Sequence, residues 1–311
     1  AISRYARWLP DEGRRETWEE TVERYCENIV EQSMPDGYRY GDTYQDIRDA
    51  ILSLSVMPSM RALMTAGPAS DRDNTCIYNC SYLPVDDPKS FDEAMFILLC
   101  GTGVGFSVER QYVNQLPSVP SEFKETGCIV VDDSKEGWAY AYRALVQDLY
   151  DGLIPTWDVS GIRPAGAKLK TFGGRASGPD PLVDLFQFTI EVFRNAAGRK
   201  LTSIECHDLM CKIGEIVVVG GVRRSAMISL SNLSDDRMRH AKSGQWWITD
   251  PHRQLSNNSV SYTDKPDAES FMREWLALME SKSGERGIFN RQASKKQSAR
   301  NGRRDAKWDF G

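Results

Sequence analysis

The alternation of apolar and polar positions divides the chain into helical and strand-like segments. Apolar residues recur at helical spacing over residues 17–31 and 42–54, and again over residues 91–100, 135–150 and 181–197. Three short runs predict strands, namely residues 127–131, the β-branched run 215–221 and the alternating run 256–262. Helices interleaved with short buried strands favour an α/β fold.

Composition narrows the class of protein. The 311 residues are 41% hydrophobic and 27% charged, with a net charge of −5, which is typical of a globular chain and unfavourable for binding nucleic acid. The sequence has no apolar run long enough to span a membrane and no apolar signal-peptide core at its start. Seven cysteines without such a signal indicate a reducing compartment. We therefore expect a cytoplasmic protein that binds neither nucleic acid nor membrane.

The most informative segment couples a cysteine to a glycine run. Cys80 lies in Asn-Cys-Ser-Tyr, and the apolar helix that follows ends in Gly-Thr-Gly-Val-Gly at residues 101–105. The run lacks the Lys-Ser/Thr of a phosphate loop and the spacing of a dinucleotide fingerprint. Glycines there allow a ligand or another backbone to approach closely. Taken alone, Cys80 is as readily a packing residue as a reactive one.

Further motifs follow in a fixed order along the chain. They are Val-Met-Pro-Ser-Met-Arg-Ala-Leu at 56–63, the cysteine and glycine motifs, Ile-Arg-Pro-Ala-Gly at 162–166, Thr-Phe-Gly-Gly-Arg-Ala-Ser-Gly-Pro at 171–179, Val-Gly-Gly-Val-Arg-Arg-Ser-Ala at 219–226, Leu-Ser-Asn-Asn-Ser-Val at 255–260 and Gly-Ile-Phe-Asn-Arg at 287–291. From about residue 50 onward, this series resembles the class II, adenosylcobalamin-dependent ribonucleotide reductases. The resemblance is to the N-terminal part of their catalytic subunit.

The resemblance implies a role for Cys80. Removing the ribose 2′-hydroxyl as water requires two electrons, which a pair of thiols supplies by closing to a disulfide. The resemblance gives one of these thiols to Cys80 and places its partner in a later strand, beyond Gly311. Cys76 is the rival for the role. A zinc half-site formed by Cys76 and Cys80, with Cys206 and Cys211 as the second pair, is the structural alternative.

The same resemblance implies sites for two nucleotides. The substrate, a ribonucleoside di- or triphosphate, is expected to contact Ser59 and the backbone at Thr102 and Gly103. Ser59 could instead be a helix cap. A dNTP effector is expected near a larger set of acidic, basic and loop residues, namely Asp86, Asp87, Arg163, Lys168, Lys170, Gly221, Arg223 and Arg224. For the loop at 220–226, the alternative is a plain turn with solvated arginines.

The implied fold is a ten-stranded α/β barrel built from two five-stranded parallel halves. On this reading, residues 1–55 form an N-terminal helical region, and residues 56–311 form roughly the first half of the barrel. An insertion at about 107–160 favours the cobalamin class over the diiron class. We expect adenosylcobalamin to be bound mainly by the missing part. The chain's three histidines, His207, His240 and His252, show no metal-ligand spacing, so no metal site is predicted.

The family's radical-bearing cysteine lies in Asn-Pro-Cys-x-Glu, a motif that these 311 residues do not contain. We therefore expect the chain to need a C-terminal reductase polypeptide and a thioredoxin-like reductant, and to reduce no ribonucleotide alone. A non-catalytic dNTP-binding module derived from a reductase is the alternative. An unrelated α/β scaffold protein with structural thiols is a third reading.

Overall fold

The computed structural model describes residues 5–35, 41–167, 175–219, 226–300, 302 and 304–305. The chain forms two compact units, Ala1–Asn79 and Cys80–Gly311. The predicted domain boundary at residue 55 falls within the first unit. Among the described residues, no helix combines the length and the apolar character needed to cross a membrane.

The first unit is mainly helical. Its elements are β1 (Trp8–Leu9), β2 (Arg14–Arg15), α1 (Trp18–Tyr25), the π-helix η1 (Cys26–Val30), α2 (Glu31–Ser33), α3 (Asp42–Leu52), α4 (Met60–Thr65), α5 (Pro68–Arg72) and the 3-10 helix η2 (Asn74–Ile77). Thr17 and Glu20 form a capping box at the start of α1. Val22, Cys26, Tyr44 and Ile51 pack into a small core. The two predicted helices of this region are confirmed.

The second unit alternates strands and helices. In chain order, its elements are β3 (Cys80–Pro84), α6 (Lys89–Leu99), β4 (Gly103–Ser107), α7 (Arg110–Val113), β5 (Lys124–Val130), α8 (Lys135–Tyr150), β6 (Leu153–Asp158), α9 (Asp180–Asn195), α10 (Ser203–Val219), β7 (Met227–Asn232), α11 (Asp236–Arg239), α12 (Trp246–Thr249), the 3-10 helix η3 (Pro251–Leu255), β8 (Ser256–Tyr262), α13 (Ala268–Ser281), β9 (Gly287–Asn290) and α14 (Arg291–Ala299). This alternation confirms the α/β class.

Five strands form one all-parallel sheet in the order β3-β4-β7-β8-β9. Residues on one face, such as Val104 and Phe106, join the main hydrophobic core. The opposite face carries Cys80 and Tyr82, both exposed. A five-stranded parallel sheet is what the resemblance implies for one barrel half, and closure into a ten-stranded barrel stays a prediction.

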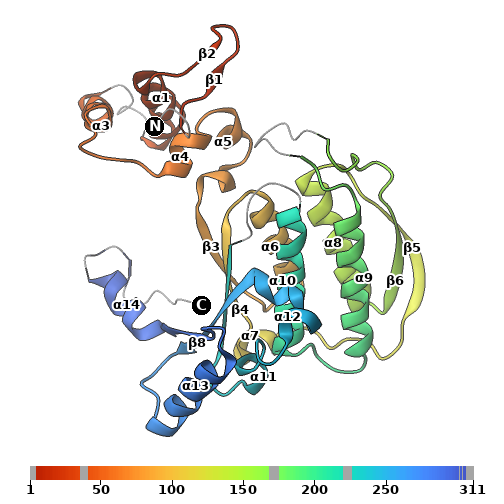
Figure 1. The fold of residues 1–311 in the computed structure, drawn as a ribbon. Coiled ribbons are helices and arrows are strands. Elements are labelled where there is room, and N and C mark those ends of the chain that lie inside the picture. Colours follow the sequence, from red (N-terminus) through yellow and green to blue (C-terminus); the bar gives the residue numbers. More distant parts are fainter. Residues whose placement is uncertain are drawn as a thin grey trace. The chain divides into compact units, whose positions relative to one another are not determined.

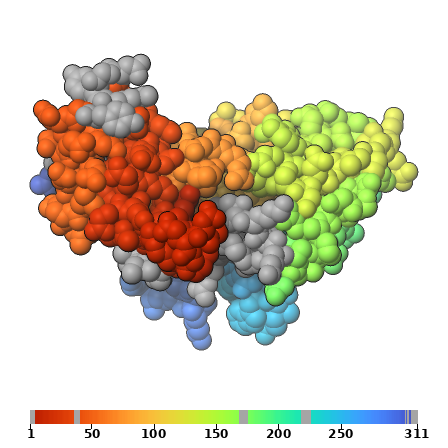
Figure 2. Space-filling view, turned by 90° about the horizontal axis from the view of Figure 1, so that it is seen from above, coloured from red at the N-terminus to blue at the C-terminus, as the bar shows by residue number. Residues whose placement is uncertain are grey.

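Helices cover the core face of this sheet in two layers. Helices α6 and α10 lie against the strands, and α8 and α9 lie beyond them (Figure 1). The parallel pair β5 and β6 lies outside α8 and α9. Most of β5 is exposed, and its segment, yellow-green in Figure 2, lies at the surface. The Cys80 face therefore receives no cover from these four helices.

One predicted strand is wrong. Residues 215–219 are the last turns of helix α10. Ile213, Ile216 and Val217 are buried in the main core, at helical spacing. A short apolar β-branched run fits a buried helix as well as a buried strand, and here the helix that begins at Ser203 continues through it. The predicted strands at 127–131 and 256–262 are confirmed as β5 and β8.

Candidate active site

Cys80 is the first residue of strand β3, and its side chain is exposed. Its register partner across the parallel pair β3–β4 is Gly103. The adjacent Ser81 hydroxyl donates a hydrogen bond to the Gly103 carbonyl oxygen at 3.1 Å. The Asn-Cys-Ser motif is therefore joined to the glycine run, and the thiol stands next to a residue without a side chain.

The glycine run reverses the chain between α6 and β4. Gly101 has φ of 79°, a left-handed conformation that favours glycine after a helix. Thr102 is only 2% exposed, so its side chain belongs to the interior. A ligand beside Cys80 could meet the backbone of this segment rather than the Thr102 hydroxyl. The predicted use of the backbone at Thr102 and Gly103 by the substrate stays a prediction.

Beyond Cys80, one row of residues crosses four strands of the open face. Tyr82, Gly105, Ile228 and Asn257 are register neighbours. Tyr82 is 41% exposed and Ile228 is 40% exposed. A Cβ at Gly105 would lie 3.5–3.6 Å from these two side chains, so glycine leaves the strand surface hollow between them. The row forms a partly apolar surface on the same face as the thiol.

A buried ion pair supports this face at the far end of β4. The Arg291 guanidinium donates to both Glu109 carboxylate oxygens, at 3.1 and 2.6 Å, and the Ser107 hydroxyl donates to the same carboxylate at 2.8 Å. Burial raises the pKa of Tyr82, and the nearby Tyr112 adds to that shift. The Tyr82 phenol therefore stays neutral at neutral pH, and Arg291 joins the start of α14 to the end of β4.

Ser59 lies in the first unit, at the N-cap position of α4. The residue is exposed, and its side chain makes no capping hydrogen bond. Ser59 therefore occupies the N-cap position that the helix-cap alternative requires, but its hydroxyl does not cap the helix. The role of Ser59 toward a substrate stays a prediction.

Two cationic side chains, Lys135 and Arg163, lie near the junction where α6 ends and α8 begins. Lys135 Nζ lies 3.1 Å from Cys100 Sγ and 4.6 Å from the centre of the Phe96 ring. Arg163 Nε donates to the Asp133 carboxylate at 2.7 Å, two residues before Lys135. Lys135 and Arg163 therefore lie at the end of α6 that leads into the glycine run.

Asp86 and Asp87 lie at the opposite end of the same helix. The Asp87 carboxylate accepts a hydrogen bond from the Lys89 backbone N–H at 2.9 Å, at the start of α6. Eleven helical residues separate this end from Cys100, a rise of roughly 16 Å. The structure therefore does not bring these two aspartates together with Arg163. The other predicted effector residues, Lys168, Lys170, Gly221, Arg223 and Arg224, lie outside the described residues.

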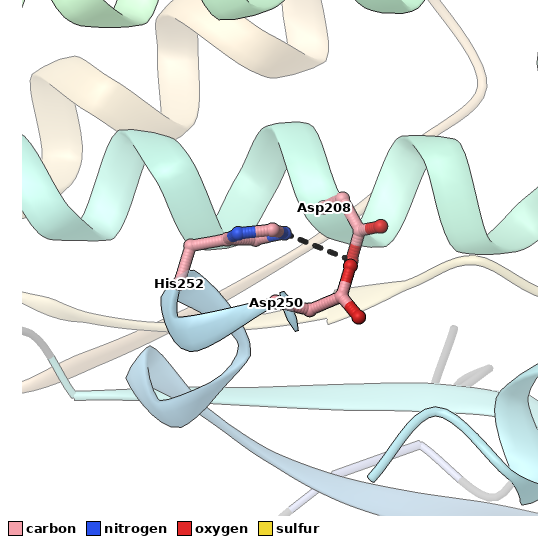
Figure 3. A group of neighbouring side chains, drawn as sticks. All are labelled: Asp208, Asp250 and His252. Carbon is pink, nitrogen blue, oxygen red and sulfur yellow. Dashed lines mark ion pairs between the residues drawn. The ribbon is translucent and has the colours of Figure 1, made fainter. Parts of the chain in front are cut away.

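A separate cluster contains Asp208, Asp250 and His252, whose potential ligand atoms lie within 4.8 Å of one another (Figure 3). His252 Nε2 lies 3.3 Å from the Asp208 carboxylate. The Arg253 guanidinium, however, binds both Asp208 oxygens at 2.7 Å and approaches Asp250 at 3.3 Å. Arg253 therefore occupies the position of a cation, and the cluster is explained as an ion-pair network. It contains no cysteine, so it gives no support to the zinc alternative.

Sequence reasoning missed this network and its neighbour His207. The sequence indicates no role for His207, which shows no metal-ligand spacing, yet His207 is fully buried beneath the sheet, 3.2 Å from Asp208 and 2.9 Å from Asn258. His207 and Asn258 are 51 residues apart in sequence, so no local spacing reveals their contact. In the sequence, the only signal for this network is that His207 and Asp208, a histidine and an acid, are adjacent in a chain with few histidines.

Comparison with known proteins identifies the relatives of this chain. Residues 107–193 match the family model described as the B12-dependent ribonucleotide reductase insertion domain. This range begins at the predicted insertion start and extends beyond its predicted end at 160. The match covers β5, α8, β6 and most of α9.

Curated relatives and a solved structure match nearly the whole chain. The adenosylcobalamin-dependent ribonucleoside-triphosphate reductase of Lactobacillus delbrueckii subsp. bulgaricus is 31% identical over 359 residues, covering 94% of this chain and 48% of the relative. That of Lacticaseibacillus paracasei is 29% identical, with the same coverage of 94% and 48%. A crystal structure of a B12-dependent (class II) ribonucleotide reductase superposes with a TM-score of 0.78 at 27% identity, covering 93% of this chain and 48% of that one. The chain thus spans about half the length of the relatives that it matches.

Proposed function

Because the chain belongs with the adenosylcobalamin-dependent (class II) ribonucleotide reductases in sequence and fold, we propose that it acts in the reduction of ribonucleotides to 2′-deoxyribonucleotides. The observation that carries this proposal is the exposed Cys80 thiol at the head of a parallel strand, opposite Gly103, in a chain with these relatives. The alternative of a non-catalytic dNTP-binding module is not favoured, because the curated relatives described above are named as reductases.

In this proposal, Cys80 is one of the two thiols that together supply two electrons to the substrate. Two thiols lose two protons and two electrons as they close to a disulfide, and the substrate's 2′-carbon gains those electrons as its hydroxyl leaves as water. The exposed position of Cys80 beside Gly103 leaves room for a ribose to approach the sulfur. Cys76 is 5% exposed and is the weaker candidate for this role.

The substrate is a ribonucleoside di- or triphosphate, and the relatives, which are ribonucleoside-triphosphate reductases by name, favour the triphosphate. The ribose would lie over the backbone of Thr102 and Gly103. Ser59, in the first unit, stays a predicted substrate contact that the sequence resemblance implies. The row of Tyr82, Gly105 and Ile228 then offers a partly apolar surface next to the reacting atoms.

Adenosylcobalamin, when bound, supplies the radical that begins such a reaction. On the open face, the glycines at 103 and 105 leave space for a bulky group to approach the sheet. Among the described residues, this space is the one feature that is compatible with the cofactor. We assign no residue of this chain to the cobalamin itself. What this chain contributes is the thiol, the backbone beside it and the partly apolar surface next to it.

We further propose that a dNTP effector binds near the end of α6, where its phosphates would contact Arg163, which pairs with Asp133, and Lys135, which lies beside Glu136. Lys168, Lys170, Gly221, Arg223 and Arg224 stay predicted effector contacts that the sequence resemblance implies. Asp86 and Asp87 are left out, because a ligand held by Arg163 would have to extend along the whole of α6 to reach them.

The proposed partners are a C-terminal reductase polypeptide and a thioredoxin-like reductant. Within the described residues, β3 and β9 are edge strands, and the Cys80 face of the sheet exposes Tyr82 and Ile228. Unpaired edges and exposed apolar side chains favour further pairing and cover. The other half of the reductase, in the same or a second polypeptide, would provide both.

The experiment is an assay of the complete protein with a ribonucleoside triphosphate, adenosylcobalamin, a dNTP and a dithiol. We expect wild-type protein to form deoxyribonucleotide over many turnovers and Cys80→Ser to lose multiple turnover. Cys76→Ser is the matched control and should retain it, since losing a buried packing thiol costs on the order of 1 kcal/mol of stability. An active Cys80→Ser with an inactive Cys76→Ser would assign the role to Cys76.

A further inference from the structure

Beneath the sheet, one side-chain oxygen joins three elements. Asn258 Oδ1, on β8, lies 2.9 Å from His207 Nε2 on α10 and 3.0 Å from the Ser229 hydroxyl on β7. His207 and Ser229 are fully buried, and Asn258 is 3% exposed. The Phe106 ring of β4 lies 6.1 Å from the imidazole. Helix α10 is therefore bonded to β8, and the same oxygen links β8 to β7.

These contacts define the protonation of His207. An amide oxygen only accepts hydrogen bonds, so both the Ser229 hydroxyl and His207 Nε2 donate to it. On the other side of the ring, Nδ1 lies 3.2 Å from the Asp208 carboxylate, which is also only an acceptor when ionised. With the amide oxygen of Asn258 facing the ring, this arrangement assigns protons to both nitrogens of the imidazole, which makes the buried ring an imidazolium.

The charges around the ring agree with this state. Burial alone lowers the pKa of an imidazole, but the neighbouring Cys211 and Asp208 raise the pKa of His207 above its usual value. Cys211 Sγ lies 3.6 Å from His207 Nε2. Asp208 is itself fixed by the two hydrogen bonds from Arg253. The imidazolium is thus held on one side by an ion pair and on the other by the sheet.

The position of this network relates it to the Cys80 face. Ser229 and Asn258 are direct register partners, and the residues just before them, Ile228 and Asn257, point to the opposite face of the sheet. That opposite face carries Cys80 and the row that contains Ile228. A shift of α10 along its axis would break the hydrogen bond from His207 to Asn258. The break would be costly, because a buried donor has no water to replace its partner.

We propose that His207 and Asn258 are positioning residues that couple helix α10 to the sheet face carrying Cys80. Through this contact, a nucleotide bound where α6 and α10 end changes which substrate the face accepts. Helix α10 and strand β7 are consecutive in the chain, and both meet at Asn258. The inference rests on the proposed function and adds to it residues that touch neither substrate nor effector.

The first test is independent of enzymatic activity. The complete protein is labelled with 15N at histidine, and His207→Gln assigns the His207 signals. We expect both His207 ring nitrogens to be protonated and to show no titration between about pH 6 and pH 8, where an ordinary histidine loses its charge. A His207 ring that titrates near its usual pKa of about 6.5 would overturn the imidazolium and the contact built on it.

The second test measures coupling in the complete protein. Two ribonucleoside triphosphates, one purine and one pyrimidine, compete as substrates with and without a dNTP, and the ratio of their kcat/KM values is followed. We expect the dNTP to shift this ratio by at least about fivefold in wild type, and by less than half as much in His207→Gln and Ser229→Ala. The exposed His240 provides the control His240→Gln, which should respond as wild type does.

The outcomes separate the two claims. If wild type forms no deoxyribonucleotide under any condition, the proposed function fails and the coupling fails with it. If wild type and His240→Gln respond to the dNTP, and His207→Gln responds equally, the coupling alone is overturned. A loss of the dNTP response in His207→Gln, with the half-saturating dNTP concentration unchanged, supports the positioning role, because a general loss of stability would lower all rates together.

Discussion

At the scale of single residues, the Asp208 carboxylate has the most unusual surroundings in the described part of the chain. Burial alone raises the pKa of a carboxyl group, but hydrogen bonds from Arg253, His207 and His252 lower the pKa of Asp208 well below its ordinary value. Its side chain is 13% exposed. The ionised form is therefore strongly preferred in the folded state.

This shift predicts a dependence of stability on pH. The folded pKa lies below the unfolded value of about 3.9, so the ionised carboxylate stabilises the fold above about pH 4 and loses that contribution as the pH falls toward the folded pKa. We expect Asp208→Asn to lower the free energy of unfolding at pH 7 by roughly 3–5 kcal/mol, because Arg253 and His207 lose their counter-charge. The variant should also lose less stability than wild type between pH 5 and pH 3.5.

Urea unfolding at a series of pH values measures both effects. Asp184→Asn, at an exposed position of α9, is the matched control and should follow the wild-type curve. Equal acid sensitivity of Asp208→Asn and wild type would contradict the assignment of this carboxylate as the acid-sensitive group.

Residues differ in how far the sequence alone could predict them. Cys80 is predictable because its motif precedes the apolar helix and glycine run that end beside it. His207, Asn258 and Arg253 are not, because their contacts join α10, β8 and η3 across stretches of 45–51 residues. Arg291 and Glu109 are likewise 182 residues apart. Such pairs follow from the parallel topology, which places distant residues in register.

At the scale of elements, the helices with mixed polar and apolar faces were predicted closely, and α8 was placed at its observed ends. The run at 215–219 failed because Ile216 to Val219 are consecutive β-branched residues, which are as typical of a buried strand as of a buried helix end. The predicted effector residues do not all lie together in the structure. The order of motifs along the chain does not reveal that α6 separates Asp87 from Arg163.

The start of α8 provides a prediction at this scale. Gly137 is buried in the first turn, and a Cβ there would lie 2.6 Å from both the Cβ and the backbone oxygen of Asp132. We expect Gly137→Ala to lower the free energy of unfolding by about 1–3 kcal/mol, because the added Cβ forces the backbone to shift. The cost of that shift exceeds the gain of about 1 kcal/mol in helix propensity.

Gly127→Ala in β5 is the comparison, since a Cβ there meets nothing within 4 Å. That variant should match or slightly exceed wild-type stability, because alanine loses less backbone entropy than glycine in a strand. Thermal unfolding of the two variants decides the matter. A Gly137→Ala protein as stable as Gly127→Ala would mean that the turn between Asp132 and α8 is not as tight as described.

At the scale of the whole molecule, the chain spans about half the length of its reductase relatives. Its five-stranded sheet places Cys80 on the face opposite helices α6 and α10. In our account, this face is where the second half of the reductase and the substrate come together. The network at His207 then holds the opposite face of the same sheet in register.

The most direct test of this account is the oxidation state of Cys80 after one turnover. The complete protein is reduced, freed of dithiol and given a ribonucleoside triphosphate with adenosylcobalamin and a dNTP. Its cysteines are then labelled with an alkylating agent and identified by mass spectrometry. The account predicts that Cys80 becomes protected in a disulfide in proportion to the deoxyribonucleotide formed, while Cys76 stays reduced. Deoxyribonucleotide formation with Cys80 still fully alkylated would contradict it.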